Sequence, residues 1–355
     1  MSKLASEQAA ERTMTLVSSI FQEANVSPLP ASGLSCFLKS AEMKTPGQML
    51  ISTVAGRYLA DVEPRAGSVR VRLPDLNADE TVSVLASAIE FLSAQSRNIS
   101  LVEVDNVQPS DFPMGMHSGN SLTVDVREFW QWPMPWIANP AWPHPQVHVM
   151  TNGQYHPKRP RKPVGVVYER YIPWLDQVLS FRAADPQTDL GHFHRWMNDE
   201  QVNVIWEDGG DREKHAAILE ERLRDPHILA LIGCFNGVPF GYFEVYWARE
   251  NRLGPYYDAQ DYDRGWHVAI GEPAYRGKQW ITAWLPSLMH FMFLDDPRTQ
   301  RIVGEPRASH EQQIRNLDRS GFSKVKHFDF PHKRAMLVML LRERFFDDRL
   351  WVPAP

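Results

Sequence analysis

The sequence predicts a mixed α/β fold in two domains, and three observations support that prediction. The chain has 355 residues and is 43% hydrophobic, which is long for one domain and apolar enough for a sizeable core. Stretches of strand-like alternation interchange with stretches of helical periodicity. A basic, proline-rich stretch at 156–163 (HPKRPRKP) separates a weakly patterned part from a strongly patterned one. We therefore expect an N-terminal α/β domain over 1–155, a solvated linker over 156–165 and a C-terminal domain over 166–355.

The composition is that of an ordinary cytosolic protein. The formal net charge is −5 and the isoelectric point is near 6.2, which argues against nucleic acid as a partner because phosphate binding needs a basic surface. The two cysteines, Cys36 and Cys234, are far apart, so we expect neither a disulfide framework nor a zinc motif. No apolar run approaches the roughly 20 residues of a membrane span, and the first residues lack the apolar stretch of a signal peptide. We expect a cytoplasmic protein without a membrane partner.

The N-terminal part predicts a small α/β unit. Apolar residues at helical spacing between 14 and 21 indicate a short helix near the start. The stretch 68–74 alternates as a strand, 77–95 has the periodicity and the cap of a helix, and 98–105 is a second strand. A strand, a helix and a strand in this order form a mixed α/β unit. None of these segments carries a recognisable catalytic pattern.

Tryptophan and proline accumulate at 129–145 (FWQWPMPWIANPAWPHP). Proline at this density disfavours a helix or a central strand, because it lacks the backbone N–H and fixes φ. We expect an irregular strap packed across a surface, and an aromatic ligand site stays open as the less favoured alternative.

The C-terminal part gives a clearer order: a strand, two helices, a strand hairpin, a strand, a helix, a strand, a helix and two strands. The hairpin carries Asn236-Gly237 between two apolar runs, which is the strongest short-range signal for a tight turn between strands. The elements are expected at 179–185, 188–199, 211–225, 227–235, 238–248, 264–270, 277–294, 300–305, 309–321, 322–330 and 333–341.

This order of elements resembles the GNAT acyltransferase fold, a mixed twisted sheet flanked by helices. The stretch YRG (275–277) opens a helix directly after a strand and resembles the turn with which that fold binds the pyrophosphate of coenzyme A. The motif is shortened, since the usual second glycine is replaced near Lys278-Gln279. The resemblance implies acetyl-CoA as the co-substrate and no metal ion. The expected contacts to coenzyme A are Ile270, Arg276, Gly277, Lys278, Gln279 and His310, the last at a position where many GNAT proteins have Asn. Whether the N-terminal domain is a degenerate GNAT-like unit stays open.

A closer resemblance covers roughly 165–345. The stretches that carry it are FHRWMNDEQV (193–202), WED (206–208), LIGCFNGVPFGYFEVYWA (231–248), YYDAQDYDRGWH (256–267), DDPRTQRIVGEPR (295–307) and DFPHKRAMLVM (329–339). They resemble the hydroxylysine acetyltransferases of aerobactin biosynthesis and related siderophore acyltransferases. The resemblance implies an acyl-CoA-dependent transferase that acts on an N-hydroxylated diamine or amino acid side chain. The product would be a hydroxamate for a siderophore used in iron acquisition.

The same resemblance implies two catalytic residues, His267 and Glu305. The strand pattern agrees with it, because Trp266 and Val268 share one face and leave His267 on the other. Glu305 stands where its strand ends, at the edge where α/β sheets place ligands. We expect direct attack of the hydroxylamine nitrogen on the thioester, with His267 or Glu305 removing its proton. Backbone N–H groups near the end of the 264–270 strand would stabilise the oxyanion.

Other residues are expected around the acceptor. Trp206, Tyr246 and Trp247 are expected to line its pocket, while Glu244 holds the substrate ammonium or makes a structural hydrogen bond. Lys333 binds an acceptor carboxylate or belongs to a solvated hairpin. The partner is a small-molecule hydroxylamine, with a siderophore synthetase or a second copy of the chain left open. Two alternatives remain: a GNAT enzyme for another amine, such as an aminoglycoside, and a non-catalytic module that docks a siderophore synthetase.

Overall fold

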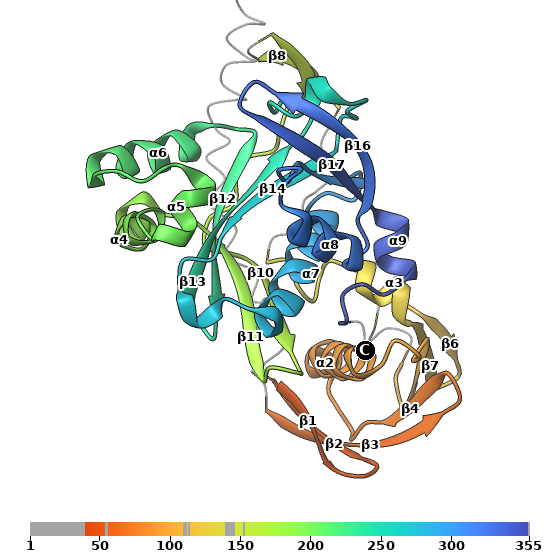
Figure 1. The fold of residues 1–355 in the computed structure, drawn as a ribbon. Helices are drawn as coiled ribbons and strands as arrows, with labels where there is room; N and C mark the ends of the chain where they lie inside the picture. The colour runs from red at the N-terminus through yellow and green to blue at the C-terminus, as the bar shows by residue number, and fades with distance from the viewer. Residues whose placement is uncertain are drawn as a thin grey trace, which may run out of the picture. The chain divides into compact units, whose positions relative to one another are not determined.

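The structure is a computed structural model, and its described residues contain two large mixed sheets and a two-stranded ribbon (Figure 1). These residues belong to one compact unit, and the predicted α/β fold is confirmed. The structure describes residues 40–53, 56–108, 112, 114–138, 146–151 and 153–353. The helix expected near 14–21 and Cys36 lie outside them. No helix in these ranges is both long enough and apolar enough to cross a membrane.

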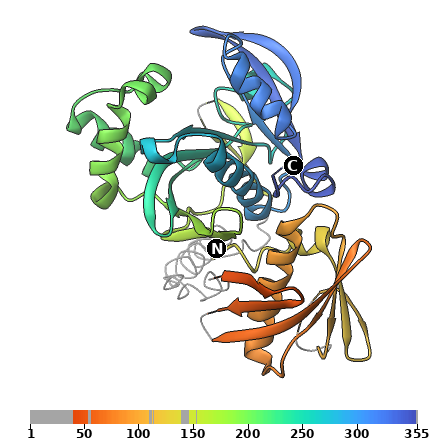
Figure 2. The ribbon, with the colours of Figure 1, turned by 60° about the horizontal axis from the view of Figure 1, so that its bottom comes forward.

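The N-terminal sheet has seven strands in the order β1-β2-β3-β4-β5-β7-β6. All neighbours are antiparallel except β4 and β5, which helix α2 connects. Asn77 caps α2 in a capping box with Glu80, and the predicted strand–helix–strand unit is confirmed. Figure 2 shows α2 beside this sheet. The elements are β1 Ser40–Thr45, β2 Gln48–Ser52, β3 Arg57–Arg65, β4 Ser68–Arg72, α2 Ala78–Gln95, β5 Leu101–Asp105, β6 Met116–Ser118, β7 Ser121–Asp125 and α3 Val126–Gln131.

The C-terminal sheet has eight strands in the order β10-β11-β12-β13-β14-β15-β17-β16. Again one pair is parallel, β14 with β15, and helix α7 connects them. The predicted hairpin turns at Asn236 and Gly237, whose φ angles of 48° and 78° are those an Asn-Gly turn favours. The strands are β10 Val166–Ile172, β11 Gln177–Ala183, β12 Ile228–Phe235, β13 Val238–Trp247, β14 Arg264–Ala269, β15 Arg301–Gly304, β16 Ser323–Phe330 and β17 Lys333–Leu341.

Helices cover both faces of the C-terminal sheet (Figure 1). On one face α4, α5 and α6 pack through a buried cluster that includes Phe193 and Tyr242. On the other face α7 and α8 pack on side chains such as Phe243, the neighbour of Tyr242 on β13. The alternation of a strand therefore separates two layers of helices. The helices are α4 Pro186–Met197, α5 Glu200–Trp206, α6 Arg212–Arg224, α7 Lys278–Asp295, α8 Glu311–Arg319 and α9 Arg342–Asp347, with short 3-10 turns at Gly254–Tyr256 and Pro273–Tyr275.

The two sheets share one topology around their parallel pair. In each sheet a helix connects the two parallel strands, β4 to β5 and β14 to β15. The second parallel strand then pairs on its other side with the later strand of an antiparallel hairpin. The strand orders are therefore β4-β5-β7-β6 and β14-β15-β17-β16. They differ in how far the parallel strands stay together. Strands β4 and β5 pair from Ser68–Leu101 to Arg72–Asp105, whereas β14 and β15 pair only at Arg264–Ile302 and Gly265–Val303. The N-terminal sheet thus resembles the C-terminal one without its open strand pair.

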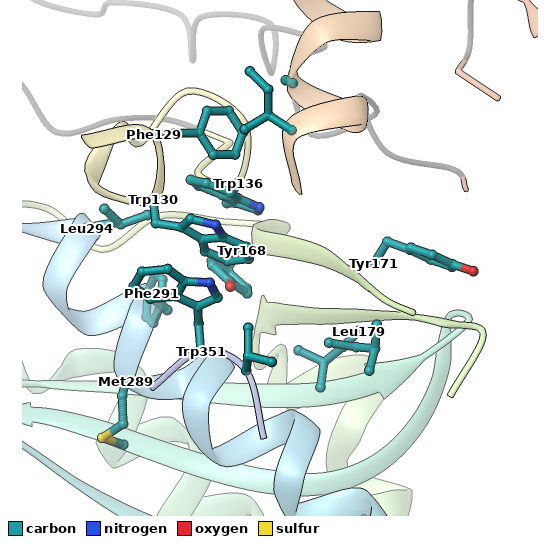
Figure 3. Packing of buried hydrophobic residues seen from close by; sticks show 14 of the residues in the cluster. Phe129, Trp130, Trp136, Tyr168, Tyr171, Leu179, Met289, Phe291, Leu294 and Trp351 are labelled. Atoms are coloured by element: carbon teal, nitrogen blue, oxygen red, sulfur yellow. The ribbon is translucent and has the colours of Figure 1, made fainter. Parts of the chain in front are cut away.

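Aromatic side chains join the two sheets into one core. Trp136, Trp130 and Trp351 stack in sequence (Figure 3), with ring centroids 4.8 and 4.9 Å apart, and all three are fully buried. Glu90 of α2 accepts a hydrogen bond from Trp136 and lies 3.7 Å from Arg170 of β10. Trp130, in helix α3, and Trp136 are therefore part of the core and form no surface strap or ligand site. Residues 139–145 lie outside the description.

The proline-rich stretch 156–163 is not a purely solvated linker. Its first residues belong to β9 (Gln154–Pro157), which pairs with β8 (His148–Thr151). The side chain of Arg159 is only 1% exposed, binds both carboxylate oxygens of Glu250 at 2.6 Å and lies 4.3 Å from the Trp247 ring. A cation with a carboxylate partner and an aromatic face is held in the core. The domain limits expected from this stretch stay a prediction.

Candidate active site

An opening between β14 and β15 creates the site. After Gly304 the chain leaves β14 and follows β17 instead. The Pro306 carbonyl accepts a hydrogen bond from the Met336 N–H, and Arg307 forms an isolated β-bridge with Ala335. Proline contributes no donor at this point. The second half of β14 is therefore unpaired on that side, and its backbone edge is open to a ligand.

His267 lies at this opening between two carboxylates. On β13, Glu244 stands directly opposite His267, and its Oε2 is 3.1 Å from His267 Nδ1. On the other side, Glu305 follows the end of β15, and its Oε1 is 3.2 Å from His267 Nε2. The structure thus brings the two predicted catalytic residues together and adds Glu244 as a third member.

Cations and hydroxyls surround both carboxylates. Glu244 Oε1 accepts hydrogen bonds from Arg222 Nε at 2.8 Å and the Tyr242 hydroxyl at 3.0 Å. For Glu305 the partners are the Tyr246 hydroxyl at 3.1 Å and the Arg252 guanidinium at 3.3 Å. Lys333 donates to the main-chain oxygen of Glu305 at 2.8 Å.

These contacts fix the charges of the array. Burial would lower the pKa of His267, but hydrogen bonds and charge from Glu244 and Glu305 raise it to about 9. Burial would raise the pKa of each carboxyl group, but His267 and the neighbouring cations lower both pKa values to about 2. At neutral pH the resting site therefore holds an imidazolium between two carboxylates. The His267 side chain keeps 26% of its surface exposed, whereas both carboxylates are almost wholly buried.

A cleft of about 330 Å³ opens onto this array. It is lined by as many cationic side chains as carboxylates, apart from the histidines, so it is not an acidic site. The cations are Arg222, Arg252, Arg307 and Lys333, and the carboxylates are Glu207, Asp208, Glu244 and Glu305.

The predicted acceptor residues divide between the cleft and the core. Trp206 lines the cleft, and its indole N–H donates to the Val268 carbonyl at 3.1 Å. Lys333 also lines it, with 14% of its side chain exposed. Tyr246 and Trp247 lie elsewhere: Tyr246 is fully buried beneath His267, with ring centroids 4.9 Å apart, and Trp247 is held between two guanidinium groups.

Glu244 borders the cleft, but its geometry fits the structural alternative better than ammonium binding. Both of its oxygens already accept hydrogen bonds, from His267 on one side and from Arg222 and Tyr242 on the other. The carboxylate orients His267 and leaves Nε2 toward Glu305. We regard Glu244 as a positioning residue of the array.

The two crossover helices differ at their first turns. Helix α2 begins with the side-chain cap of Asn77, whereas α7 begins at Gly277, whose φ of 124° only glycine adopts readily, and has no side-chain cap. Uncapped N–H groups at a helix start are donors for an anion, and the helix dipole adds to the attraction. Among the two, α7 alone offers that site.

The residues expected around coenzyme A follow this start of α7. Ile270, Gly277 and Lys278 line a groove between α7 and α8, and His310 lines the catalytic cleft. Gln279 lies in the first turn of α7 and lines none of the cavities described here.

Arg276 also borders the groove, but its guanidinium is already engaged by the protein. It donates to the carbonyls of Ile270 and Gly271 at 2.9 and 3.0 Å and pairs with Asp199 at 2.9 Å. Arg276 therefore fixes the turn between β14 and α7 rather than presenting a free charge to phosphate.

Two cations that contact the carboxylates of the array were not predicted, Arg222 and Arg252. Arg222 lies on α6, whose many charged residues are typical of a helix exposed to solvent. Arg252 lies in the loop after β13. No local motif marks either position. The one signal for Arg222 was Glu244, since a carboxylate among buried aromatic residues of a strand requires a cation nearby.

Comparison with known proteins agrees with this fold. The acetyltransferase (GNAT) domain family matches residues 185–330. Among solved structures, an uncharacterized protein from Bacillus halodurans has a TM-score of 0.50 and 29% sequence identity, covering 54% of this chain and 96% of that one. The fold is that of a GNAT acyltransferase.

Curated relatives define the family more closely. The chain is 43% identical over 269 residues to an N(6)-hydroxylysine O-acetyltransferase from Escherichia coli. The aligned region covers 74% of this chain and 85% of that enzyme. It is 45% identical over 196 residues to an N(5)-hydroxyornithine:cis-anhydromevalonyl coenzyme A-N(5)-transacylase from Beauveria bassiana, covering 54% and 43%. The chain belongs to the family of the N(6)-hydroxylysine O-acetyltransferase, and the resemblance found in the sequence is confirmed.

Proposed function

We propose that this protein transfers an acyl group, with acetyl as the first choice, from coenzyme A to the nitrogen of an N-hydroxylated amine. The product is a hydroxamate, an iron-binding group of siderophores. The observation that carries the proposal is the Glu244–His267–Glu305 array at the open edge of β14. The names of the relatives support it, because they specify hydroxylysine and hydroxyornithine as acceptors.

The charges of the array suggest how protons move. The hydroxylamine nitrogen attacks the thioester carbon, and once bonded to it becomes acidic enough for the Glu305 carboxylate to accept its proton. The tetrahedral oxyanion lies near the unpaired edge of β14, where backbone N–H groups stabilise it. The carbon–sulfur bond then breaks, and cationic His267 gives its proton to the departing thiolate. Transfer of the proton from Glu305 to His267, across the 3.2 Å contact, restores the resting state.

The cleft favours an acceptor that carries a carboxylate. Arg252 is 53% exposed on its side chain and has one carboxylate contact, to Glu305, at 3.3 Å. Lys333 and Arg307 also line the cleft, as do the carboxylates of Glu207 and Asp208, and Arg307 pairs with Glu207 at 2.9 Å. Cations and carboxylates together suit the zwitterionic end of an N-hydroxylated amino acid. A polycationic aminoglycoside would meet repulsion from the cations.

The experiment is release of coenzyme A from acetyl-CoA with N6-hydroxylysine, N5-hydroxyornithine and N-hydroxycadaverine, beside their unhydroxylated parents. Ferric iron is added afterwards, because a hydroxamate chelates iron through two oxygens and gives a coloured complex, whereas an O-acylated hydroxylamine does not. We expect release that requires the hydroxylamine, an iron-positive product, and a loss of at least about 10²-fold in His267→Ala. Exposed His327 on β16 provides the matched control, His327→Ala.

Each other outcome points to a different function. Release with an iron-negative product would mean acylation at oxygen. Release with the unhydroxylated amines alone would mean a GNAT enzyme for another amine. A protein that does not bind coenzyme A at all would fit the docking module instead.

A further inference from the structure

The split between β14 and β15 is open at one end and closed at the other. The two strands pair at Arg264–Ile302 and Gly265–Val303 and separate after these positions. Toward the far end of β14, Val268 lines both the catalytic cleft and a second cavity that extends beside α7. A ligand can therefore extend past the end of β14, whereas toward Gly265 the paired strands stop it.

The ring of Trp266 lies across the closed end. Trp266 is the first residue of β14 beyond the paired positions, and Gly304 is the first such residue of β15. A Cβ atom on Gly304 would be 2.9 Å from Cη2 and 3.1 Å from Cζ3 of Trp266, so the tip of the ring reaches the second strand, and a glycine is needed there to make room. The indole therefore bridges the two strands where they begin to separate.

The catalytic cleft enters this split and ends at the indole. Trp266 and His267 point to opposite faces of β14, yet both line the cleft, so the cleft reaches between the strands. Trp266 is 9% exposed and packs against Phe322, with ring centroids 5.0 Å apart at an interplanar angle of 39°. Leu317 of α8 lines the cleft as well. The indole is thus held in place by packing and offers an apolar surface to a ligand.

We propose that Trp266 limits the length of the acyl group that this protein transfers, and that it selects acetyl or propionyl donors over longer or carboxylated ones. This inference rests on the proposed function, which places the thioester at His267, beside the unpaired edge of β14. The thioester carbon carries sulfur on one side and the acyl chain on the other. The sulfur side extends toward the open end of the split, so the acyl chain points toward Trp266.

The indole selects by steric exclusion and by desolvation. A chain that reaches the ring cannot pass it, because Phe322 packs on the ring and its tip already lies against Gly304. A terminal carboxylate, as in a succinyl group, would lose its hydration against Trp266 and Leu317 without a cationic partner from either. In hydrophobic pockets one methylene changes kcat/KM by roughly 10–200-fold, so each carbon beyond the available length should be costly.

The test compares acetyl-, propionyl-, butyryl- and succinyl-CoA with one hydroxylamine acceptor. In the wild type, kcat/KM should fall at least about tenfold from propionyl to butyryl, and succinyl should be no better than butyryl. In Trp266→Leu the ratio of kcat/KM for butyryl to that for acetyl should rise at least about tenfold, and Trp266→Phe should lie between the two. Each ratio is measured within one variant, so a smaller folded fraction cancels from it.

Trp174→Leu is the matched control. Trp174 lies in the connection between β10 and β11, is partly buried and is outside the catalytic cleft. Its replacement by leucine removes as much side chain as Trp266→Leu and should leave the preference among the four donors as in the wild type. A change of preference in this control as large as in Trp266→Leu would overturn the proposal, because the effect would then not depend on the split.

Other results would also overturn it. A wild type that uses butyryl-CoA about as well as acetyl-CoA has no length limit, and an unchanged ratio in Trp266→Leu means that the limit lies elsewhere. Calorimetric titration with the S-ethyl and S-butyl thioethers of coenzyme A gives the same comparison without any acceptor. The wild type should bind the S-ethyl compound at least about tenfold more tightly, and Trp266→Leu should reduce that difference. If no hydroxylamine is acylated, the proposed function fails, but these titrations still decide the role of Trp266.

Discussion

Replacing Glu244 by glutamine tests the charge state assigned to His267. The pKa of His267 is raised to about 9 by two carboxylates, and the proposed mechanism requires the protonated ring. Glu244→Gln keeps the shape of the side chain and removes one of the two charges. A single carboxylate within about 4–6 Å shifts a pKa by roughly 1–3 units. We therefore expect the pKa of His267 to fall by at least about one unit, to roughly 8 or below.

The assay is the pH dependence of kcat/KM. In the wild type the rate should be constant near neutrality and fall as the pH rises past about 9, because His267 loses its proton there. In Glu244→Gln this fall should move to lower pH by the same amount as the pKa, with only a modest change in the plateau below it. NMR titration of the His267 ring in the free enzyme gives the pKa independently.

Tyr242→Phe is the matched control. It removes a hydroxyl that donates to the same carboxylate at 3.0 Å but keeps the charge, so its rate profile should stay close to the wild type. The reasoning is refuted if the rate rises with pH up to about 9 in the wild type, since His267 would then act as the base. It is also refuted if Glu244→Gln leaves the alkaline fall where it was.

Three further predictions follow from separate parts of the structure. Gly277→Ala should lower Tm and weaken binding of coenzyme A about tenfold by calorimetry, because alanine at a φ of 124° costs roughly 1–3 kcal/mol; unchanged affinity would contradict the assignment of the α7 start. Arg252→Gln should lower kcat/KM for N6-hydroxylysine at least about tenfold more than for N-hydroxycadaverine, and an equal loss for both acceptors would instead point to its contact with Glu305. Burial raises the pKa of Glu90 from 4.5 to about 8, so between these values the folded protein holds a proton that the unfolded chain releases, and stability falls as the pH rises. Glu90→Gln should therefore gain Tm relative to the wild type between pH 6 and 9, and a parallel decline of both proteins would show that Glu90 does not cause this dependence.

The sequence predicted the C-terminal fold because its elements carry strong local signals. The Asn236-Gly237 turn, the buried periodicity of α7 and the alternation of β14 each depend on residues close in sequence. His267 and Glu305 were predicted through the resemblance to a family, and strand alternation placed His267 on the correct face. That Glu244 orients His267 could not be decided, because it depends on the register of two strands.

Long-range pairing accounts for most of what the sequence did not reveal. Arg159 belongs to a basic, proline-rich stretch that reads as a linker, yet Glu250, far along the chain, makes its burial favourable. The pattern of 129–145 predicts an irregular segment on the surface, because its prolines interrupt any periodicity. In the structure Trp130 and Trp136 are fully buried. Arg276 fits a phosphate motif locally, but Asp199 and two carbonyls occupy its guanidinium.

The two sheets differ at the places where the proposed acyl donor would bind in the C-terminal half. Both have a parallel strand pair joined by a helix, but β4 and β5 stay paired to Arg72–Asp105, and Asn77 caps the helix between them. That half therefore has no comparable open backbone edge at its parallel pair, and a side chain caps the start of its connecting helix. In the C-terminal half the strands separate after Gly265, and Gly277 leaves the helix start uncapped. The order of strands therefore gives the framework, and the local choices at the end of the strand and the start of the helix decide which half is the transferase.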